Sequence, residues 1–432
     1  MIKKLYLVFI AFLALNTHAQ EGTTSPYSFY GLGSLKFKGT TENVSMGGLS
    51  IFTDSIHVNL RNPASYAGRM VNETGLGHIV KFAVGASSLN NTLKTSTVSD
   101  KANTATFDYL AISLPMGRFG MGLGLMPYTS VGYRLESITD EDVLDYRYRG
   151  EGGVNKAFFG IGYLLAENFR IGVDAHYNFG NLQNNVVNFR YDDEGNPLQY
   201  HSREINRSDL SGLNFNLGLT YTPMISEKLQ LTSSFTFSPK ADLTSANQRT
   251  FGSVLVNSSG QEFPINEIEE DLEALGLDET VLTLPTKTAF GLGIGEPRKW
   301  FLGAEYTMLK TSEFTNEIFS FDNATYQDAS TVSVGGFFIP QHNSFTYWKR
   351  AVYRAGIRFE NTGLKIENQS ISEFGMSFGV GLPVGDFLSN VNIGIEVGQR
   401  GTTSQNLVKE NFVNFQLSLS LNDRWFAKRK YN

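Results

Sequence analysis

Six ionisable residues lie at alternate positions in stretches that are otherwise apolar or small: Asp174, His176, Glu305, Arg354, Arg358 and Glu396. Their neighbours, including Val173, Ala304, Tyr353, Ile357 and Ile395, are uncharged. Side chains alternate between the two faces of a strand, so the ionisable groups would share one face. Such charges cost little on the lumen side of a barrel if they are hydrated or paired. We expect a polar path or a latch there; a plain solvated lumen is the alternative.

The sequence contains few of the residues that enzyme active sites use. The histidines beyond residue 19 are scattered and lack metal-ligand spacing: His57, His78, His176, His201 and His342. There is no Gly-x-Ser-x-Gly nucleophile motif. There is also no Cys, which excludes disulfides and thiolate chemistry. We therefore expect no enzyme, no metal and no cofactor, and the net charge of −6 argues against a nucleic-acid partner.

A period-two pattern indicates which elements would position the ionisable groups. Near the C-terminus, apolar Phe415, Leu417 and Leu419 alternate with polar residues, and residues 213–221 repeat the pattern. We predict Phe415, Leu417 and Leu419 outwards, and Asn414, Gln416 and Ser418 inwards. Only 18% of the residues are charged, whereas soluble domains carry about 25%. With 43 Gly and 13% aromatic residues, this composition is typical of a transmembrane β-barrel.

Fourteen such strands can be placed, an even number as bacterial barrels require. The expected centres are Val80, Leu110, Leu123, Ile161, Val173, Leu217, Phe235, Phe290, Ala304, Val334, Ile357, Phe378, Ile393 and Leu417. Short turns, such as residues 115–118 and 296–298, alternate with longer polar stretches at 136–150, 191–207 and 238–283. Short periplasmic turns and long extracellular loops are the expected ends of an antiparallel all-β barrel in the outer membrane.

The first 19 residues read as a signal peptide. Lys3 and Lys4 precede a short apolar run, and Thr17 and Ala19 form a small-residue cleavage site. The alternative, a membrane anchor, would need roughly 20 apolar residues. We therefore predict export and location in the outer membrane of a Gram-negative bacterium. The expected divisions are a signal peptide at 1–19, a hatch at 20–72, a barrel at 73–421 and a periplasmic tail at 422–432.

Residues 21–70 do not follow the strand pattern. They are rich in Gly and turn residues, and Asn62 followed by Pro63 is a helix-start signal. We expect this segment to plug the lumen, where irregular backbone is shielded from lipid; a periplasmic extension is the alternative. In the lumen, Asp54 or Arg61 would contact charges such as Arg354, Arg358 or Glu396.

Residues 238–283 contain one helix signal. Asn266 can cap, Glu269 can complete a capping box, and Gly276 can end the helix. Ile268, Leu272 and Leu275 would then share an apolar face. This face could collect hydrophobic ligand at the cell surface, or it could simply pack as a lid on the barrel rim.

The C-terminal residues 422–432 add aromatic and basic side chains after the last strand. They include Trp425, Phe426, Arg424, Lys428, Arg429 and Lys430. One interpretation is a periplasmic docking patch for another protein. The other is an interface anchor whose Trp lies at the lipid headgroups.

Several motifs resemble those of the FadL-like outer-membrane family. They are Gly47 and Gly48, then Asp54, then Asn62-Pro63-Ala64, followed by the Gly-rich strand at residues 290–293 and the Arg-x-Gly strand at 353–359. Residues 25–31 and 422–426 resemble Bacteroidetes members. The Asn-Pro-Ala-x-Tyr-Ala variant is similar to that of PorV-type barrels in the type IX secretion system. The resemblance covers essentially the whole mature chain, and it implies a fourteen-strand barrel with an N-terminal hatch.

The resemblance leaves two functions open. FadL itself takes up long-chain fatty acids, which implies a channel for small hydrophobic molecules. PorV-type barrels imply a non-enzymatic scaffold or binding subunit of an outer-membrane protein secretion or assembly complex. The expected partners are outer-membrane lipid with either hydrophobic small molecules or other outer-membrane and periplasmic proteins.

Overall fold

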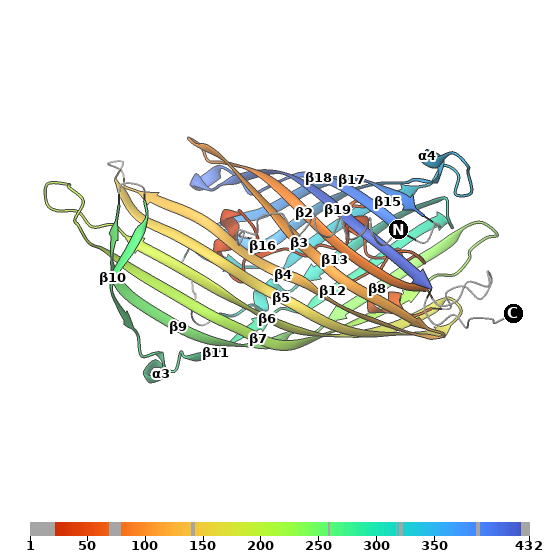
Figure 1. Ribbon diagram of the computed structural model, residues 1–432, viewed down its shortest axis with the longest axis horizontal. Coiled ribbons are helices and arrows are strands. Elements are labelled where there is room, and N and C mark those ends of the chain that lie inside the picture. Colours follow the sequence, from red (N-terminus) through yellow and green to blue (C-terminus); the bar gives the residue numbers. More distant parts are fainter. Residues whose placement is uncertain are drawn as a thin grey trace.

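The computed structural model describes residues 22–68, 79–139, 143–257, 260–316, 318, 323–385 and 389–424. Its main feature is a closed antiparallel β-barrel of fourteen wall strands (Figure 1). They are β2 (Ile79–Lys94), β3 (Ser99–Met116), β4 (Phe119–Ile138), β5 (Leu144–Ala166), β6 (Phe169–Asn188), β7 (His201–Tyr221), β8 (Gln230–Ser238), β12 (Lys287–Glu296), β13 (Trp300–Leu309), β15 (Ala329–Phe338), β16 (Val352–Ile366), β17 (Gln369–Val384), β18 (Ser389–Arg400) and β19 (Lys409–Arg424).

The barrel closes where its last strand pairs with its first. Leu417 of β19 lies opposite Ala86 of β2 in this antiparallel ladder. Each of the fourteen predicted strand centres lies in one wall strand, so the predicted fold class is confirmed. The predicted facing also holds, because Phe415 is 49% exposed whereas Ser418 is 1% exposed. The apolar side chains therefore face outwards and the polar ones face the lumen.

The wall has one tall side. Strand β5 has 23 residues, whereas β12, β13 and β15 have 10 each. A membrane crossing takes about 9–11 residues, so the excess projects beyond the membrane. Three further strands complete this extension: β9 (Ala241–Val256), β10 (Glu262–Glu269) and β11 (Glu279–Leu284). Figure 1 shows the extension at the left, beyond the ends of the short strands.

The extension corrects the prediction of long loops. Residues 136–150, 191–207 and 238–283 were expected to be polar connections, yet most of them continue strands. Their backbone groups pair with neighbours, as where Ile205 of β7 lies opposite Thr250 of β9. A polar strand outside the membrane has no lipid face, so it lacks the apolar alternation by which a spanning strand is recognised.

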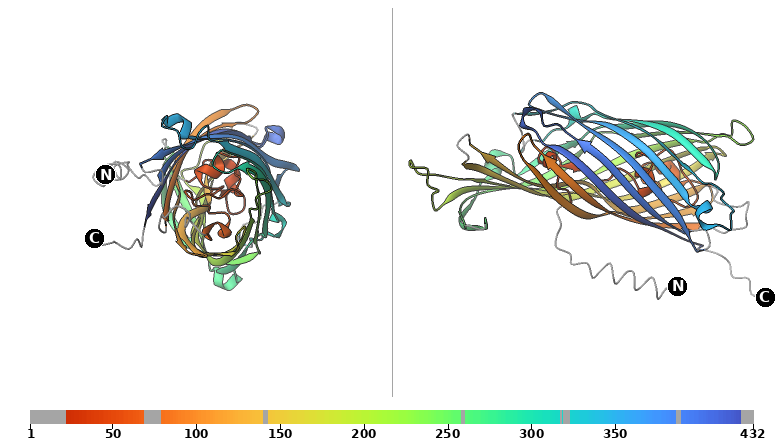
Figure 2. Two further views of the ribbon diagram at one scale, coloured as in Figure 1. Left: turned by 90° about the vertical axis from the view of Figure 1, so that its right-hand side faces the viewer. Right: turned by 90° about the horizontal axis from the view of Figure 1, so that it is seen from above.

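The N-terminal segment, residues 22–68, lies inside the barrel. Figure 2, in the view along the barrel, shows it enclosed by the wall. Its short elements are η1 (Pro26–Phe29), β1 (Ser34–Leu35), α2 (Thr41–Val44) and η2 (Pro63–Tyr66). The remaining short elements are α3 (Leu272–Leu275), η3 (Thr311–Glu313), β14 (Ala324–Tyr326), α4 (Tyr347–Arg350) and η4 (Ser404–Asn406).

Within the described part of the chain, no helix is both long and apolar enough to cross a membrane. The tail residues Trp425, Phe426, Lys428, Arg429 and Lys430 lie outside the described residues, as do residues 1–21 and Met70.

Candidate functional site

The Asn-Pro-Ala-Ser-Tyr turn of the N-terminal segment packs on a wall surface made of glycines. A Cβ atom on Gly218 would lie 2.1 Å from Asn62 Oδ1, and one on Gly172 would lie 2.4 Å from the carbonyl carbon of Pro63. Tyr66 covers Gly122 in the same way, at 2.5 Å. Real side chains cannot approach so closely. These lumen-facing glycines, on β4, β6 and β7, therefore create the space that the turn occupies.

Asn62 fixes this turn from within. It is fully buried, and its Oδ1 accepts a hydrogen bond from Ala64 N at 3.0 Å, which caps η2. Its Nδ2 donates to Ser234 Oγ at 2.8 Å and to Thr220 Oγ1 at 3.1 Å. Pro63 takes the first helical position, where its missing N–H costs nothing. One amide thus joins the turn to two wall strands, β7 and β8.

Gly47, followed by Gly48, makes a second close approach on the opposite side of the lumen. Both have positive φ, 73° and 87°, which L side chains rarely adopt. A Cβ on Gly47 would lie 2.6 Å from the carbonyl oxygen of Ile357 on β16. The Gly47 N–H donates to Ser377 Oγ of β17 at 2.9 Å. Gly47 therefore allows the backbone to touch the wall directly, whereas Gly48 serves the turn through its positive φ.

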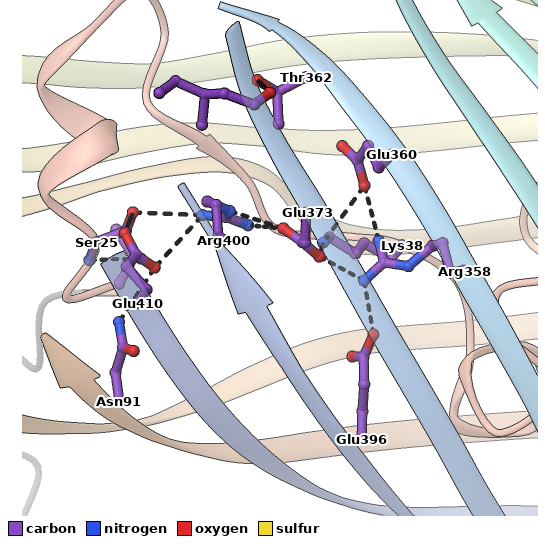
Figure 3. Close-up of polar contacts among 12 residues, drawn as sticks. Ser25, Lys38, Asn91, Arg358, Glu360, Thr362, Glu373, Glu396, Arg400 and Glu410 are labelled. Carbon is purple, nitrogen blue, oxygen red and sulfur yellow. Dashed lines mark hydrogen bonds and ion pairs between the residues drawn. The ribbon is translucent and has the colours of Figure 1, made fainter. Parts of the chain in front are cut away.

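Buried ion pairs hold the same side of the N-terminal segment. Glu373 of β17 accepts hydrogen bonds from Lys38, from Arg358 Nη2 at 2.5 Å and from Arg400 Nε at 2.7 Å (Figure 3). Arg358 also reaches Glu396 Oε1, at 2.6 Å. Glu373 is 3% exposed, so its charge is shielded from water. We call Lys38, Arg358, Glu373, Glu396 and Arg400 the ionic cluster.

Two further contacts extend this attachment. Ser25 Oγ donates to Glu410 of β19, and Arg400 Nη1 donates to Ser25 Oγ at 3.3 Å. On β13, Glu305 accepts from Arg61 Nη2 at 2.7 Å and from both the N–H and the hydroxyl of Ser50 at 2.7 Å. All these carboxylates lie on the lumen face, so the charged groups serve to hold the segment.

The predicted partners of Asp54 and Arg61 need correction. Arg61 does contact a lumen charge, but it is Glu305 and not Arg354, Arg358 or Glu396. Asp54 pairs within its own loop, with His57 Nδ1 at 2.6 Å. Burial alone would raise the pKa of Asp54, but His57 and the Lys81 ammonium outweigh it and lower that pKa below its usual range. Asp54 therefore shapes its own loop.

Asp174 and His176 stand apart from the ionic cluster. Both are buried on β6, and His176 Nε2 lies 3.7 Å from Asp174 Oδ2. Neither oxygen of Asp174 has a hydrogen-bond partner within the described residues. Of the predicted lumen charges, Glu305, Arg358 and Glu396 form ion pairs near β13–β19, whereas Asp174 and His176 lie apart, behind Tyr66. Among the described residues, no group of three or more His, Asp or Glu is placed to hold a metal ion.

The wall is interrupted between β3 and β4. Their ladder runs only from Leu110↔Leu125 to Met116↔Phe119. Beyond it, the only wall strand paired with β3 is β2 and the only one paired with β4 is β5, which leaves a gap on the side of the tall extension. The N-terminal strand β1 enters this gap, where Ser34 pairs with Ser130 and Leu35 with Thr129 of β4. The edge of the wall is therefore covered by a piece of the internal segment.

Cavities adjoin this gap on both sides. A lumen cavity of about 230 Å³ is bordered by aromatic rings and by cations, including Tyr30, Tyr326, Phe314, Lys287 and Arg358. A notch of about 310 Å³ opens in the wall at Phe107, Ser130, Gly153 and Lys36. A smaller cavity of about 90 Å³ is also bordered by β1, and it shares Lys36 with the notch and Lys38 with the lumen cavity. Strand β1 thus borders the lumen cavity and the smaller cavity, and Lys36, directly after it, borders the notch.

The predicted surface helix is much shorter than expected. Asn266 and Ile268 belong to strand β10, and α3 covers only Leu272–Leu275, capped by Asp271 and ended by Gly276 at φ 66°. Leu272 is buried, whereas Ile268 and Leu275 are 72% and 57% exposed. The three residues do not form one helical face. Pairing of residues 262–269 with β9 outweighed the local helix signal.

Several site residues were missed: Lys38, Glu373, Arg400 and Glu410. The period-two pattern contained the signal for three of them. Glu373 shares its face with Ser377, Arg400 with Glu396, and Glu410 with Asn414, as two-residue steps along each strand require. Lys38 lies in irregular backbone, where no periodic pattern in the sequence indicates which way a side chain points.

This architecture is shared with known outer-membrane proteins. One family model, described as BamG, matches residues 1–432. The chain belongs to the BamG family. No match was found among curated proteins. A solved structure of the toluene transporter TodX of P. putida aligns with this BamG-family chain at a TM-score of 0.59 and 13% identity, and the alignment covers 91% of this chain and 100% of TodX.

Two other solved structures give the same result. A FadL homologue from Pseudomonas aeruginosa aligns at a TM-score of 0.57 and 13% identity, covering 91% of this chain and 100% of the homologue. The monoaromatic hydrocarbon channel CymD aligns at 0.53 and 14% identity, covering 93% of this chain and 100% of CymD. At these identities the likeness shows the fold: this BamG-family chain has the architecture of FadL-like outer-membrane barrels.

Proposed function

We propose that the chain is an outer-membrane channel through which small hydrophobic molecules enter the lumen cavity and leave sideways through the gap between β3 and β4. The observation that carries this proposal is the interrupted ladder beyond Leu110↔Leu125. A complete ladder would seal the wall, because every backbone group at membrane depth must be paired or shielded. Here β1 supplies the shield, and a strand of two residues can be displaced at small cost.

The lumen cavity supports this proposal. Its border combines aromatic rings, such as Tyr30, Phe314 and Tyr326, with aliphatic Leu364 and Ile371. Apolar surface of this kind binds apolar ligands by excluding water. Two of the similar solved structures are described as a toluene transporter and a monoaromatic hydrocarbon channel. An aromatic-lined cavity fits the same class of ligand.

The test is to lock β1 onto β4. The chain has no Cys, so Ser34→Cys with Ser130→Cys would introduce one defined disulfide between opposed residues. Entry of the hydrophobic dye N-phenyl-1-naphthylamine into cells should fall in the oxidised variant and return after reduction. A second pair, Ile205→Cys with Thr250→Cys, joins strands β7 and β9 in the extension and serves as the control. Equal dye entry in the locked, reduced and control proteins would contradict lateral exit.

A second candidate function is a scaffold or binding subunit of an outer-membrane protein secretion or assembly complex. The observation that favours it is the tall extension, whose apolar side chains are exposed: Phe251 is 43%, Phe263 is 47% and Ile268 is 72% exposed. Exposed apolar residues grouped on a projecting sheet are a feature of protein interaction sites. Their position lies outside the membrane, so lipid does not account for them.

Affinity purification from detergent-solubilised membranes separates the two functions. Stoichiometric partner proteins that are lost from a Phe251→Ser/Ile268→Ser variant would support the scaffold. Purification of the chain alone, with dye entry that responds to the β1 lock, would support the channel. Leu302→Ser, which changes an exposed side chain on the lipid face of β13, controls for general loss of apolar surface.

A further inference from the structure

The connection between β15 and β16, residues 339–351, contains the short helix α4 and lies at the short-turn end of the barrel. Figure 1 shows α4 at the right-hand end, opposite the tall extension, and Figure 2 shows it outside the ring of wall strands. The short turns were expected on the periplasmic side. We therefore expect α4 near the periplasmic surface of the membrane, far from the gap between β3 and β4.

A row of aromatic residues crosses the wall beside this connection. Trp300 of β13 lies opposite Phe338 of β15, and Phe338 lies opposite Tyr353 of β16. Phe338 and Tyr353 are exposed, and Tyr353 continues into the apolar outer face of β16 at Ile357. Aromatic girdles of this kind mark the membrane–water interface of a barrel. The lipid-facing surface therefore reaches the base of α4.

Tyrosine hydroxyl groups hold α4 against the outside of the wall. The Tyr353 hydroxyl donates to the carbonyl oxygen of Trp348 at 3.1 Å, and the Tyr347 hydroxyl donates to the carbonyl oxygen of Pro383 on β17 at 3.0 Å. Arg350 stacks over the Tyr347 ring, with 5.5 Å between its guanidinium carbon and the ring centroid. Tyr353 belongs to the outward-facing residues of β16, so α4 lies on the lipid side of the wall and not over the lumen.

Two large aromatic side chains of the connection lie on its surface. Phe345 is fully exposed, and Trp348 is 61% exposed. Aromatic surface left in water is unfavourable, whereas an indole ring at the headgroup level can bury its apolar part and keep its N–H hydrated. Because the lipid-facing surface is continuous with α4, lipid is the medium that covers these rings.

The charges beside α4 are mainly positive. Lys349 is exposed, and so are Arg298 and Lys299 in the β12–β13 turn. The two connections adjoin, since the N–H of Ile339 donates to the carbonyl oxygen of Lys299 at 2.7 Å. Glu296 is the one carboxylate of the turn and pairs with Lys299 at 3.0 Å, whereas the β15–β16 connection contains no Asp or Glu. Cations at a membrane surface attract anionic headgroups.

We propose that α4 and the β12–β13 turn form a binding site for an anionic phospholipid of the periplasmic leaflet. Lys349 and Arg298 bind the headgroup phosphate, and Trp348 and Phe345 lie between the headgroup and the first part of the acyl chains. The site fixes the depth of the barrel in the membrane at this point of its circumference. The proposal rests on the outer face alone and does not depend on lateral transport.

The test measures lipid contact at Trp348. The chain has three Trp, so Trp300→Phe with Trp425→Phe leaves Trp348 as the single indole fluorophore. The protein is placed in phosphatidylcholine nanodiscs that contain increasing amounts of dibrominated phosphatidylglycerol or dibrominated phosphatidylcholine, because bromine quenches indole fluorescence on contact. Both lipids should quench, and the anionic lipid should reach half its effect at an about fivefold lower mole fraction.

Two charge variants show whether the preference comes from this site. Arg298→Gln/Lys349→Gln should make the two brominated lipids equivalent. Arg118→Gln/Lys228→Gln removes the same charge from the exposed β3–β4 and β7–β8 turns at the same end of the barrel and should keep the preference. Equal quenching by both lipids in the unaltered background, or a preference that survives Arg298→Gln/Lys349→Gln, would overturn the proposal.

A second measurement needs no charge variant and separates lipid from a protein partner. The chain has no Cys, so Phe345→Cys can be labelled at one position with the environment-sensitive dye NBD. In nanodiscs its emission should shift to shorter wavelength and resist quenching by iodide, whereas the label on Glu227→Cys, in the exposed β7–β8 turn, should behave as in water. Water-like emission at Phe345→Cys, or a shift seen only in native membranes that contain other proteins, would contradict lipid binding. None of these outcomes bears on the β1 lock, so the two proposals can fail separately.

Discussion

The two sides of the N-terminal segment are held to the wall by different physical means. Towards β4–β8, the turn around Asn62 fits into space left by glycines such as Gly172 and Gly218. Towards β16–β19, Lys38 and Ser25 are held by Glu373 and Glu410. One attachment depends on shape and neutral hydrogen bonds, and the other on buried opposite charges.

The difference indicates which side could move. Close packing against glycine has one fitting arrangement, since interiors tolerate few voids or overlaps. Ion pairs in a buried cluster can be exchanged by an incoming charged group, because Glu373 has three cationic partners, Lys38, Arg358 and Arg400. Strand β1, which covers the wall gap, is followed closely by Lys38 of the ionic cluster. We therefore expect β1 to be released from the charged side while the Asn62 turn stays in place.

Removing the whole segment has the largest expected effect. Deletion of residues 21–70 should raise single-channel conductance sharply in planar bilayers, because both attachments and the occupant of the lumen are lost. The barrel should remain folded, as judged by its heat-dependent mobility in electrophoresis. Deletion of residues 262–276 in the extension should leave conductance unchanged. If conductance also stays low after deletion of 21–70, something other than this segment blocks the lumen.

The second largest effect is expected from the loss of one charge in the ionic cluster. Glu373→Gln leaves Lys38, Arg358 and Arg400 with one carboxylate fewer, and breaking a buried ion pair costs about 3–5 kcal/mol. The loss should appear as a lower free energy of unfolding in urea. Glu151→Gln is the control, because its pair with Arg149 spans 3.7 Å between half-exposed side chains and such pairs contribute under about 1 kcal/mol. Similar losses in both variants would show that the cluster does not act as a buried unit.

Adding a single methyl group to the wall tests the attachment that depends on close packing, around Asn62. Gly218→Ala would place Cβ 2.1 Å from Asn62 Oδ1, and overpacking of this kind costs about 1–3 kcal/mol in unfolding free energy. Gly212→Ala, on the same strand, meets first the flexible end of Leu243 at 2.7 Å and should cost less. If Gly218→Ala is tolerated as well as Gly212→Ala, the turn is less tightly fitted than the structure indicates.

The last expected effect, no larger than that of Gly218→Ala, concerns the loop that belongs to neither attachment. The pKa of Asp54 is lowered, so its contribution to stability is present above its unfolded pKa of about 3.9 and is lost as pH falls through the lower folded value. Asp54→Asn should therefore reduce the free energy of unfolding by about 1–3 kcal/mol near neutral pH. The difference from the unaltered chain should shrink in acid. Asp209→Asn, at an exposed pair with Arg207, should show no such pH dependence. A constant difference at every pH would contradict the role of the Asp54 charge.

The wall strands could be predicted from the sequence because each spanning strand has a period-two pattern of apolar and polar residues. Phe415 and Ser418 differ in polarity since one meets lipid and the other the lumen, and the strand period of two is local. The extension was missed for the same reason. Residues such as Ile205 and Thr250 pair outside the membrane, where neither face has to be apolar.

The site was predicted only in part. Asn62, Gly47 and Gly48 were found because turns and positive φ leave a signature in residue type. The pairing of Arg61 with Glu305 joins residues 244 positions apart, and nothing local in the sequence selects that partner over Glu396. The gap between β3 and β4 was not predicted, because it depends on which strands fail to pair.

The long sequence separations between the N-terminal segment and its partners on the last wall strands bear on the order in which the molecule assembles. Ser25 contacts Glu410 across 385 residues, and Glu42 contacts Asn392 across 350. Contacts this distant in sequence form late, since the intervening chain must first be arranged. The N-terminal segment is the first described part of the chain, yet its charged partners lie on the last strands to be supplied. The turn at Asn62 can pack against β6 and β7 before the barrel closes. Lys38 can form its ion pair only after β17 has been added to the barrel. Closure of β19 on β2 and anchoring of the segment would then be one cooperative event.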